Sequence, residues 1–192
     1  MGEIVLASTS PRRRMLLEQV GIQHVVIPPK AVERTPTDSD FGETVRYNAE
    51  QKARSVISLA AGRVILGADT VVDLDGSPLG KPVDAGDARQ KLKSLSGRDH
   101  RVHSGIAVID PTRGIILCDH VVTRVWFREL ADAEIEAYIR THEPFDKAGA
   151  YGIQARGALF IERIEGCFFN VMGLPLARLW EMLTKDLRLN LG

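Results

Sequence analysis

The segment IVLASTSPRRR, residues 4–14, runs from an apolar stretch through a serine-proline turn into a cluster of arginines. Its first four residues predict a short buried strand. Ser10 suits the N-cap of a helix, and Pro11 suits the first helical turn, where its missing backbone N–H costs nothing. Gly21 marks the end of that helix. A strand that leads directly into a helix is the unit from which α/β folds are built.

The arginines stand where they do not help the helix. Arg12, Arg13 and Arg14 fall in its first turn, which carries about half a positive charge, so each cation costs roughly 0.3–1 kcal/mol. Together with the hydroxyls of Ser8 and Ser10, the arginines instead suit a bound anion, for which phosphate is the commonest candidate. A solvated basic patch is the alternative interpretation. That interpretation explains the positive charges but not the serine-proline turn that directs them towards one place.

Outside this segment, short apolar runs alternate with helical patterns. Helices are predicted at residues 41–59, 84–95, 131–139 and 174–187. Strands are predicted at residues 24–28, 64–72, 100–109, 115–127 and 158–164. Tight turns beside helical crossovers imply both antiparallel and parallel strand pairs. Because no linker or repeat interrupts this order, we expect residues 1–192 to form one α/β domain, with a mixed twisted sheet flanked by helices.

The composition excludes several classes of protein. The 192 residues suffice for one domain, and 44% of them are hydrophobic and 26% charged, as in ordinary globular proteins. Because 25 Lys and Arg balance 25 Asp and Glu, no overall field favours duplex nucleic acid or a membrane surface. No run approaches the roughly 18 apolar residues of a membrane span, and we expect a cytoplasmic protein. Cys118 and Cys167 lack metal-ligand spacing, which predicts buried free thiols.

One carboxylate interrupts the most apolar run of the chain. In VILGADTVV, residues 64–72, Asp69 is expected inside a buried strand. Burying an unpaired carboxylate is costly, so Asp69 must meet a metal, a cation or water at the end of the strand. We interpret it as a general base or a metal ligand, and a structural aspartate that caps a turn is the alternative. Asp73 and Asp75, in the turn beyond, are expected to be solvated.

Further polar residues fall at predicted bends and helix faces. Lys81 can contact phosphate as a point charge, although the glycines before it do not form a Walker A motif. Gln154 follows small residues around Tyr151 and could read the imide edge of a base by a paired donor and acceptor. Glu33 and Lys52 belong to the same group of candidates. For each of these residues taken singly, an exposed polar side chain is the alternative.

Five short motifs, in this order, resemble the Maf (septum-formation) family. They are STSPRR at residues 8–13, GADTVV at 67–72, GKP at 80–82, DKAGAYGIQ at 146–154 and NVMGLP at 170–175. The matches cover nearly the whole chain, and five motifs in register are far more specific than any one of them. The resemblance implies a nucleoside triphosphate pyrophosphatase on an inosine-triphosphatase-like α/β fold, with a cleft between two lobes.

The resemblance also implies roles for individual residues. Asp69 takes the proton-acceptor role and, with Glu33, holds a divalent cation such as Mg²⁺ or Mn²⁺. The chain departs from the family pattern at Val32, because aspartate often precedes this glutamate. The other positions fall into two sets: Arg12, Thr70 and Gln154 for substrate specificity, and Ser8, Ser10, Arg13, Lys52 and Lys81 for further contacts with the substrate.

Two features resemble the branch of the family that hydrolyses dTTP and UTP to the monophosphate and pyrophosphate. These features are the double arginine after Ser-Pro and the segment AYGIQ at residues 150–154. The branch that acts on 7-methyl-GTP usually has a different residue after Ser-Pro and lacks that glutamine. A pyrophosphatase for 7-methyl-GTP or other modified nucleotides is therefore the alternative within the enzyme class.

From another class, the chain could be a nucleotide- or nucleic-acid-binding regulator of cell division. Its zero net charge and 6% aromatic content argue against an extended surface for single strands. We therefore expect a nucleoside triphosphate as the partner, with no stable binding of nucleic acid and no membrane. A homodimer is implied by the family alone.

Overall fold

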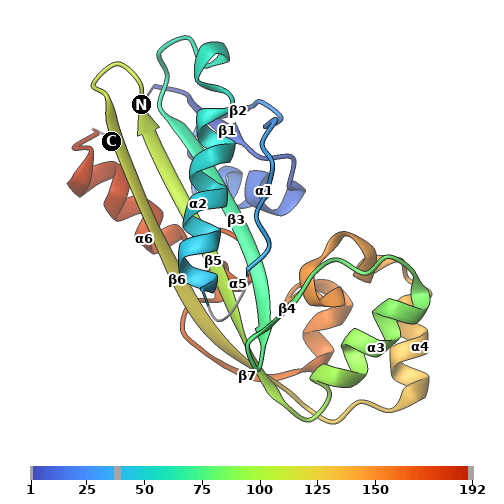
Figure 1. Ribbon diagram of the computed structural model, residues 1–192. Coiled ribbons are helices and arrows are strands. Elements are labelled where there is room, and N and C mark those ends of the chain that lie inside the picture. Colours follow the sequence, from blue (N-terminus) through green and yellow to red (C-terminus); the bar gives the residue numbers. More distant parts are fainter. Residues whose placement is uncertain (1, 37–39, 190–192) are drawn as a thin grey trace.

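The computed structural model describes residues 2–36 and 40–189, and a single mixed sheet runs through it (Figure 1). The strands are β1 (Ile4–Ala7), β2 (His24–Val26), β3 (Ile65–Leu74), β4 (Ser77–Leu79), β5 (Asp99–Asp110), β6 (Ile115–Phe127) and β7 (Ile161–Glu165). They lie in the order β2-β1-β3-β5-β6-β7, and β4 pairs with β3 off this path. β1 is parallel to β2 and β3, whereas the other pairs are antiparallel, which confirms the predicted mixed sheet.

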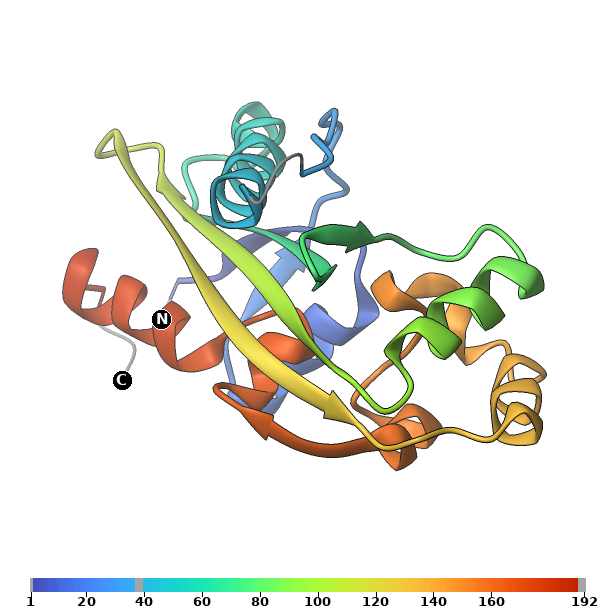
Figure 2. The same cartoon turned by 60° about the horizontal axis from the view of Figure 1, so that its bottom comes forward.

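Helices cover both faces of this sheet. The α-helices of the described residues are α1 (Pro11–Gln19), α2 (Phe41–Arg54), α3 (Ala85–Leu95), α4 (Asp132–Ile139), α5 (Phe168–Val171) and α6 (Leu176–Glu181), the last continuing as a π-helix (Met182–Asp186). α2 packs on one face, and α1 and α6 pack on the other (Figures 1 and 2). Across the described ranges, no helix combines the length and the apolar character that a membrane span requires.

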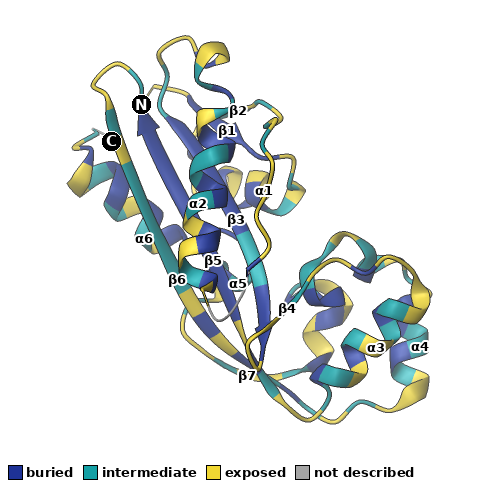
Figure 3. Cartoon of the chain, viewed as in Figure 1, coloured by how far each residue is buried: buried dark blue, intermediate teal, exposed yellow. Residues whose placement is uncertain are grey.

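A second lobe stands beside the sheet. It contains α3, α4 and three short 3-10 helices (Glu143–Asp146, Ala148–Ala150 and Ala155–Phe160), and it lies next to one end of β3, β5 and β6 (Figure 1). Its core includes Leu92, Ile135 and Phe127. We call the rest of the molecule the sheet lobe. Figure 3 shows buried residues concentrated in both lobes, so each has its own apolar core.

The central strands serve two cores at once. Leu66 and Ile106 pack with α1 and α6, whereas their neighbours Ile65 and Ala107 pack with α2. Successive side chains of a strand point to opposite faces, so a strand that is buried on both faces reads as a continuous apolar run. This explains why the sequence locates β3 and β5 well.

Two glycines let α2 lie directly on the sheet. A Cβ at Gly67 would lie 2.1 Å from the carbonyl oxygen of Ala49, and a Cβ at Gly105 would lie 2.2 Å from that of Val45. Neither position can carry a side chain while the helix stays in place. The close approach brings the polar side chains of α2 within reach of the centre of β3.

The ends of several elements differ from the sequence pattern. The predicted helix over residues 41–59 ends at Arg54, and a 3-10 helix covers Ile57–Leu59. The strand predicted over residues 158–164 begins only at Ile161, after a 3-10 helix. Apolar spacing continues through such turns, so periodicity does not show where the hydrogen-bond pattern changes.

The cysteines are free, as predicted, but both are half-buried rather than buried. The Sγ atom of Cys118 lies 3.6 Å from the carboxylate of Glu50. Burial, together with that carboxylate, raises the pKa of the Cys118 thiol to about 12. The thiol therefore stays protonated at neutral pH and is a poor nucleophile.

Candidate active site

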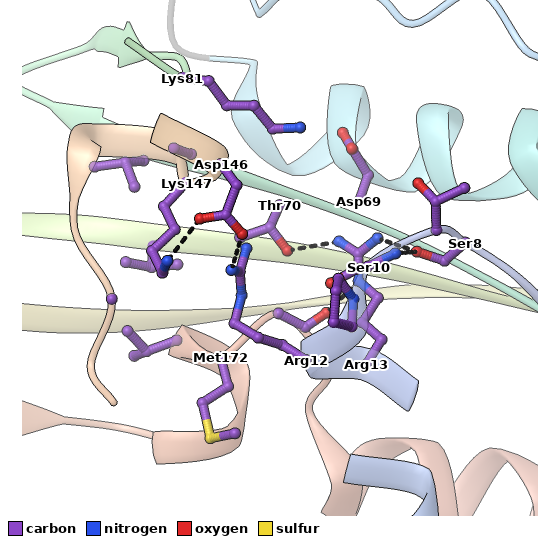
Figure 4. A pocket seen from close by; sticks show the side chains of 18 of the residues that line it. Ser8, Ser10, Arg12, Arg13, Asp69, Thr70, Lys81, Asp146, Lys147 and Met172 are labelled. Carbon is purple, nitrogen blue, oxygen red and sulfur yellow. Dashed lines mark hydrogen bonds and ion pairs between the residues drawn. The ribbon is translucent and has the colours of Figure 1, made fainter. Parts of the chain in front are cut away.

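A cavity of about 360 Å³ is lined by residues of both lobes, among them all ten residues predicted from the sequence to form the site. These residues are Ser8, Ser10, Arg12, Arg13, Glu33, Lys52, Asp69, Thr70, Lys81 and Gln154. Figure 4 shows part of this lining. β1 and β3 are parallel neighbours, with Ala7 opposite Gly67. The residues that follow these two positions therefore meet at one edge, which is where ligands bind in open α/β sheets.

The buried carboxylate of Asp69 is paired with a cation, which is one of the partners predicted from its position in an apolar strand. The residue is 5% exposed, and its Oδ1 lies 2.7 Å from Nζ of Lys52. Its Oδ2 accepts a hydrogen bond of 2.8 Å from Nδ2 of Asn48. Both partners belong to α2 and stand one helical turn apart, so they share one face of the helix. The turn-capping role belongs to Asp73, which is buried rather than solvated and accepts a hydrogen bond from the N–H of Gly76.

Lys52 also contacts the second acidic residue of the cavity. Its Nζ lies 3.0 Å from Oε1 of Glu33, so an ammonium group stands between the carboxylates of Glu33 and Asp69. No cluster of three or more His, Cys, Asp or Glu side chains placed to hold a metal occurs in residues 2–36 and 40–189. Mg²⁺, however, commonly takes one or two carboxylates and completes its shell with water and substrate phosphate. The pair of acids fits that requirement.

Arg13 is buried in the protein rather than free in the cavity. Its Nε donates to the carbonyl of Gly173, and its Nη1 donates to the carbonyl of Ala68 and the hydroxyl of Ser8. Its Nη2 donates to the hydroxyl of Thr70 over 3.1 Å. Four of the five N–H donors of the guanidinium are thus satisfied internally, and burial lowers the pKa of Arg13. Arg13 thus joins α1 to the segments of Ala68, Thr70 and Gly173 at a wall of the cavity that it also lines.

The other two arginines point in different directions. Nη1 of Arg12 lies 2.8 Å from Oδ2 of Asp146 in the second lobe. The same carboxylate lies 2.6 Å from Nζ of Lys147 through Oδ1, so it stands between two cations (Figure 4). Arg14 pairs instead with Glu18 on the exposed side of α1. Arg13 therefore connects buried segments, Arg12 forms an ion pair across the cleft, and Arg14 forms an ion pair at the surface.

Ser10 occupies the N-cap position of α1, but its side chain makes no capping hydrogen bond within the described residues. Its backbone N–H donates instead to the hydroxyl of Ser8 over 3.2 Å. The predicted N-cap position of Ser10 is therefore confirmed, and its hydroxyl, which does not cap the helix, is left at the N-terminus of a helix that lines the cavity. That position favours an anion through both the free N–H groups and the helix dipole.

Thr70 and Gln154, predicted to set specificity, and Lys81, predicted to contact phosphate, differ in whether their polar groups are already hydrogen-bonded within the protein. The hydroxyl of Thr70 lies 2.9 Å from that of Ser104 and also accepts from Arg13, so the protein engages it already. In the described part of the chain, the amide of Gln154 and the amine of Lys81 have no hydrogen-bond or ion-pair partner. Figure 4 shows the Lys81 amine reaching into the pocket. Gln154 and Lys81 are therefore ready to contact a ligand.

Comparison with known proteins identifies the family. A family model for Maf-like proteins matches residues 3–186. The chain belongs to the Maf family. It is 46% identical over 185 residues to the dTTP/UTP pyrophosphatase of Pelotomaculum thermopropionicum, covering 96% of this chain and 97% of that one. The dTTP/UTP pyrophosphatase of Alkaliphilus oremlandii is 45% identical over 192 residues, and the match covers 100% of both chains.

Among solved structures, the Maf chain is similar to the Staphylococcus aureus Ham1 protein, with a TM-score of 0.48 and 16% identity. That match covers 68% of this chain and 73% of the other. The family model and the two relatives confirm the resemblance to the Maf family that the five motifs indicate. Each of the motifs also contributes residues to the cavity lining.

Three side chains of this Maf site lie outside the set chosen from the sequence. They are Asn48, which bonds to Asp69, Asp146, which pairs with Arg12, and Lys147, which pairs with Asp146. The spacing of residues 48 and 52 on one helix face is the signal that would have indicated Asn48, because it predicts a second polar group beside Lys52. Asp146 and Lys147 fall within a motif of the family, but their pairing with α1 depends on the arrangement of the lobes.

The buried ring of Tyr151 forms part of one wall of the cavity. The ring of Tyr151 packs edge-on against Phe127, with 4.7 Å between the centroids, and its hydroxyl lies 2.6 Å from Nε2 of His100. Burial raises the pKa of Tyr151 and lowers the pKa of His100 to about 4. Both side chains are therefore neutral at pH 7, and this wall offers an uncharged surface to a ligand.

We expect His100 to make the protein sensitive to acid. Between its ordinary pKa of 6.5 and its folded pKa of about 4, the unfolded chain binds a proton that the native protein excludes. The contribution to stability is complete above pH 6.5 and is lost as the pH falls towards 4. From pH 6.5 to pH 5 this amounts to about 2 kcal/mol, since each pKa unit is worth about 1.36 kcal/mol.

Urea titrations at those two pH values, on the native protein and on His100→Gln, measure this difference. The variant is expected to lose correspondingly less stability on acidification. Tyr151→Phe should keep the native pH dependence, because burial rather than the hydrogen bond to Tyr151 lowers the pKa. Equal pH dependence in the native protein and His100→Gln would assign the effect to another group.

Proposed function

We propose that this Maf protein hydrolyses dTTP and UTP to the nucleoside monophosphate and pyrophosphate. The observation that carries the proposal is a lone buried carboxylate, Asp69, in a cavity whose cations come from both sides of the cleft. The two relatives named dTTP/UTP pyrophosphatase, at 46% and 45% identity over almost the full length, support the same activity. Neither an apolar cavity nor a solvated basic surface would need a buried carboxylate among these cations.

The reaction requires an activated water, neutralised phosphate oxygens and a positioned leaving group. Asp69 orients the water and accepts its proton while the water oxygen bonds to the α-phosphorus. The bond from that phosphorus to the bridging oxygen breaks, and its electron pair leaves with pyrophosphate. Lys52, 2.7 Å from Asp69, attracts the phosphate beside the attacking water.

The remaining charge of the phosphate chain is offset at the mouth of the cavity. Lys81 and Arg12 provide cations, and the N-terminus of α1 provides N–H groups near Ser10. Arg12 can exchange its bond to Asp146 for a phosphate oxygen at little cost, because the two side chains are 26% and 56% exposed. Exposed ion pairs of this kind contribute only about 0–1 kcal/mol.

The base is recognised at the other end of the cleft. Gln154 offers a donor and an acceptor, which match the imide edge shared by uracil and thymine. Gly152 also belongs to the lining, and the Lys147 side chain occupies the space where a Cβ would lie, 2.8 Å from its Cε, so backbone and this lysine form the wall here. The neutral wall formed by Tyr151 suits a base without charge, whereas 7-methylguanine carries a positive charge at neutral pH.

Asp69 and Glu33 are the residues that would hold Mg²⁺ or Mn²⁺. When bound together with phosphate oxygens, such a cation neutralises charge and lowers the pKa of water. Lys52 now separates the two carboxylates and would move towards the phosphate. We further infer that the protein works in the cytoplasm, where its substrates are found, and that it forms a homodimer, which light scattering would measure.

A nucleotide panel tests the proposed activity. We expect pyrophosphate release from dTTP and UTP with a kcat/KM at least about tenfold above that for CTP or 7-methyl-GTP, because a hydrogen-bonding site discriminates against a mismatched edge. Addition of a chelator should abolish release. A tenfold preference for the methylated purine would contradict the pyrimidine assignment. Salt-sensitive binding of single-stranded DNA with no pyrophosphate release under any divalent metal would indicate a regulator instead.

A further inference from the structure

Asn48 is more deeply buried than the residues it holds. It is 1% exposed and lies on α2, one turn before Lys52. Its Oδ1 accepts a hydrogen bond of 2.8 Å from the backbone N–H of Arg34. Because a backbone N–H only donates, this contact identifies the oxygen of the amide. Its Nδ2 then donates both to Oδ2 of Asp69, over 2.8 Å, and to the carbonyl of Arg34, over 2.9 Å.

Through these bonds Asn48 joins two segments of the cavity. Arg34 directly follows Glu33, so both hydrogen bonds to its backbone hold the segment that carries the second acid. The Arg34 guanidinium also stacks on the ring of Tyr47, with 3.4 Å from its carbon to the ring centroid. Two adjacent residues of α2 therefore hold the Glu33 segment in place: Asn48 contacts the backbone of Arg34, and Tyr47 contacts its side chain.

The contact with Asp69 controls the plane of its carboxylate. The terminal torsion of an aspartate is soft, so neighbouring hydrogen bonds rather than rotamer preference set its orientation. Lys52 contacts one oxygen and Asn48 the other. Each oxygen keeps further acceptor capacity for water. Unlike Lys52, the neutral amide is not drawn away by an incoming polyphosphate, so it continues to hold Asp69 during the reaction.

We propose that Asn48 is a positioning residue, which sets the carboxylate of Asp69 for its work on water and keeps the Glu33 segment at a fixed place beside it. This inference rests on the proposed hydrolysis, in which Asp69 accepts the proton. It predicts an effect on turnover rather than on affinity, because Asn48 holds the acid and not the nucleotide.

Two substitutions separate positioning from simple support of the fold. Asn48→Ala removes every contact of the amide. Asn48→Asp keeps the shape and an acceptor for the N–H of Arg34, but it replaces the donor to Asp69 and to the carbonyl of Arg34 with a second carboxylate, which repels that of Asp69. We expect each to lower kcat for dTTP about 10- to 100-fold, as misplacement of a reacting group by about 1 Å does, with KM within about threefold of the native value.

The matched control is Asp110→Ala, at the hairpin between β5 and β6 and outside the cavity lining. Asp110 is likewise buried, and it accepts hydrogen bonds from Thr112 and Arg113. This variant should show a comparable fall in the urea midpoint but native kcat and KM. Calorimetry with α,β-imido-dUTP, which cannot be cleaved, should give native affinity for all three variants.

Crystal structures of the Asn48 variants provide a readout that does not depend on turnover. We expect the carboxylate of Asp69 to rotate in both variants and the Glu33 segment to shift in Asn48→Ala. An unmoved Asp69, a kcat within about twofold of native in a folded variant, or a KM that rises as kcat falls would each overturn the inference. If the native protein releases no pyrophosphate from any nucleotide, the proposed function fails, and the Asp69 geometry still decides the role of Asn48.

Discussion

Asp69→Asn is expected to lower turnover of dTTP at least about 100-fold, a loss typical of removing a general base. The amide has nearly the same shape as the carboxylate but cannot accept a proton from water at neutral pH. The fold should persist, because Lys52 keeps its contact of 3.0 Å with Glu33 when its partner in β3 loses its charge. The affinity for nucleotide should change much less than kcat.

The measurement is the steady-state release of pyrophosphate by the native protein and the variant, with far-ultraviolet circular dichroism to verify the fold. Asp75→Asn is the matched control, since it makes the same change in the turn after β3, where Asp75 is exposed and pairs with Arg98 outside the cavity. It should leave turnover unchanged. Near-native turnover in folded Asp69→Asn would show that another group activates the water.

The need for a partner at Asp69 could be predicted from the sequence, but its identity could not. A carboxylate inside an apolar run must be compensated whatever the fold is. Which cation does so depends on the distance between α2 and β3, and that distance depends on glycines that read locally as ordinary strand residues. Helical spacing of residues 48 and 52 shows only that they share a face.

The different contacts of the three arginines could not be predicted from the sequence either. Arg12, Arg13 and Arg14 are chemically identical, and a local pattern gives each the same role. Arg13 is buried because the carbonyls of Ala68 and Gly173 come to meet it, and Gly173 lies 160 residues away. Every residue has a backbone carbonyl, so the sequence does not show which carbonyls Arg13 contacts. Such hydrogen bonds can be located only from the tertiary structure. The five motifs located the cavity because the resemblance to the family assigns residues to the site without requiring that their tertiary contacts be known.

Local turn chemistry does not determine which hydrogen bonds Asp73 and Ser10 make. Asp73 was expected in solvent because turns are generally exposed, yet it folds inward to accept the N–H of Gly76 over 2.7 Å. Ser10 occupies the predicted N-cap of α1, but its own N–H donates to the hydroxyl of Ser8, and its side chain makes no capping hydrogen bond within the described residues. In both cases a side chain can satisfy either of two neighbouring groups, and long-range packing selects between them.

Gly105→Ala is expected to destabilise the protein by at least about 3 kcal/mol, at the upper end for overpacking. The new Cβ would lie 2.2 Å from the carbonyl oxygen of Val45, 2.3 Å from its carbonyl carbon and 2.7 Å from the backbone nitrogen of Arg46. All three are backbone atoms of α2, so no side-chain rotation can relieve the clash. The helix must move away from the sheet.

Urea denaturation measures the loss of stability, and Gly80→Ala is the control. A Cβ at Gly80 would have nothing within 4 Å, so that change should alter the free energy of unfolding by less than about 0.5 kcal/mol. A loss below about 1 kcal/mol in Gly105→Ala would show that α2 can shift off the sheet cheaply.

The same substitution should also impair turnover under conditions where the protein remains folded. α2 carries both groups that hold Asp69, so a shift of the helix lengthens the contacts of 2.7 Å and 2.8 Å together. A second change, Val45→Ala, separates backbone from side-chain effects. Because the clash involves the carbonyl of Val45 and not its methyl groups, the double variant should recover neither stability nor turnover. Recovery would mean that side-chain packing, rather than the approach of two backbones, sets the distance from α2 to the acid.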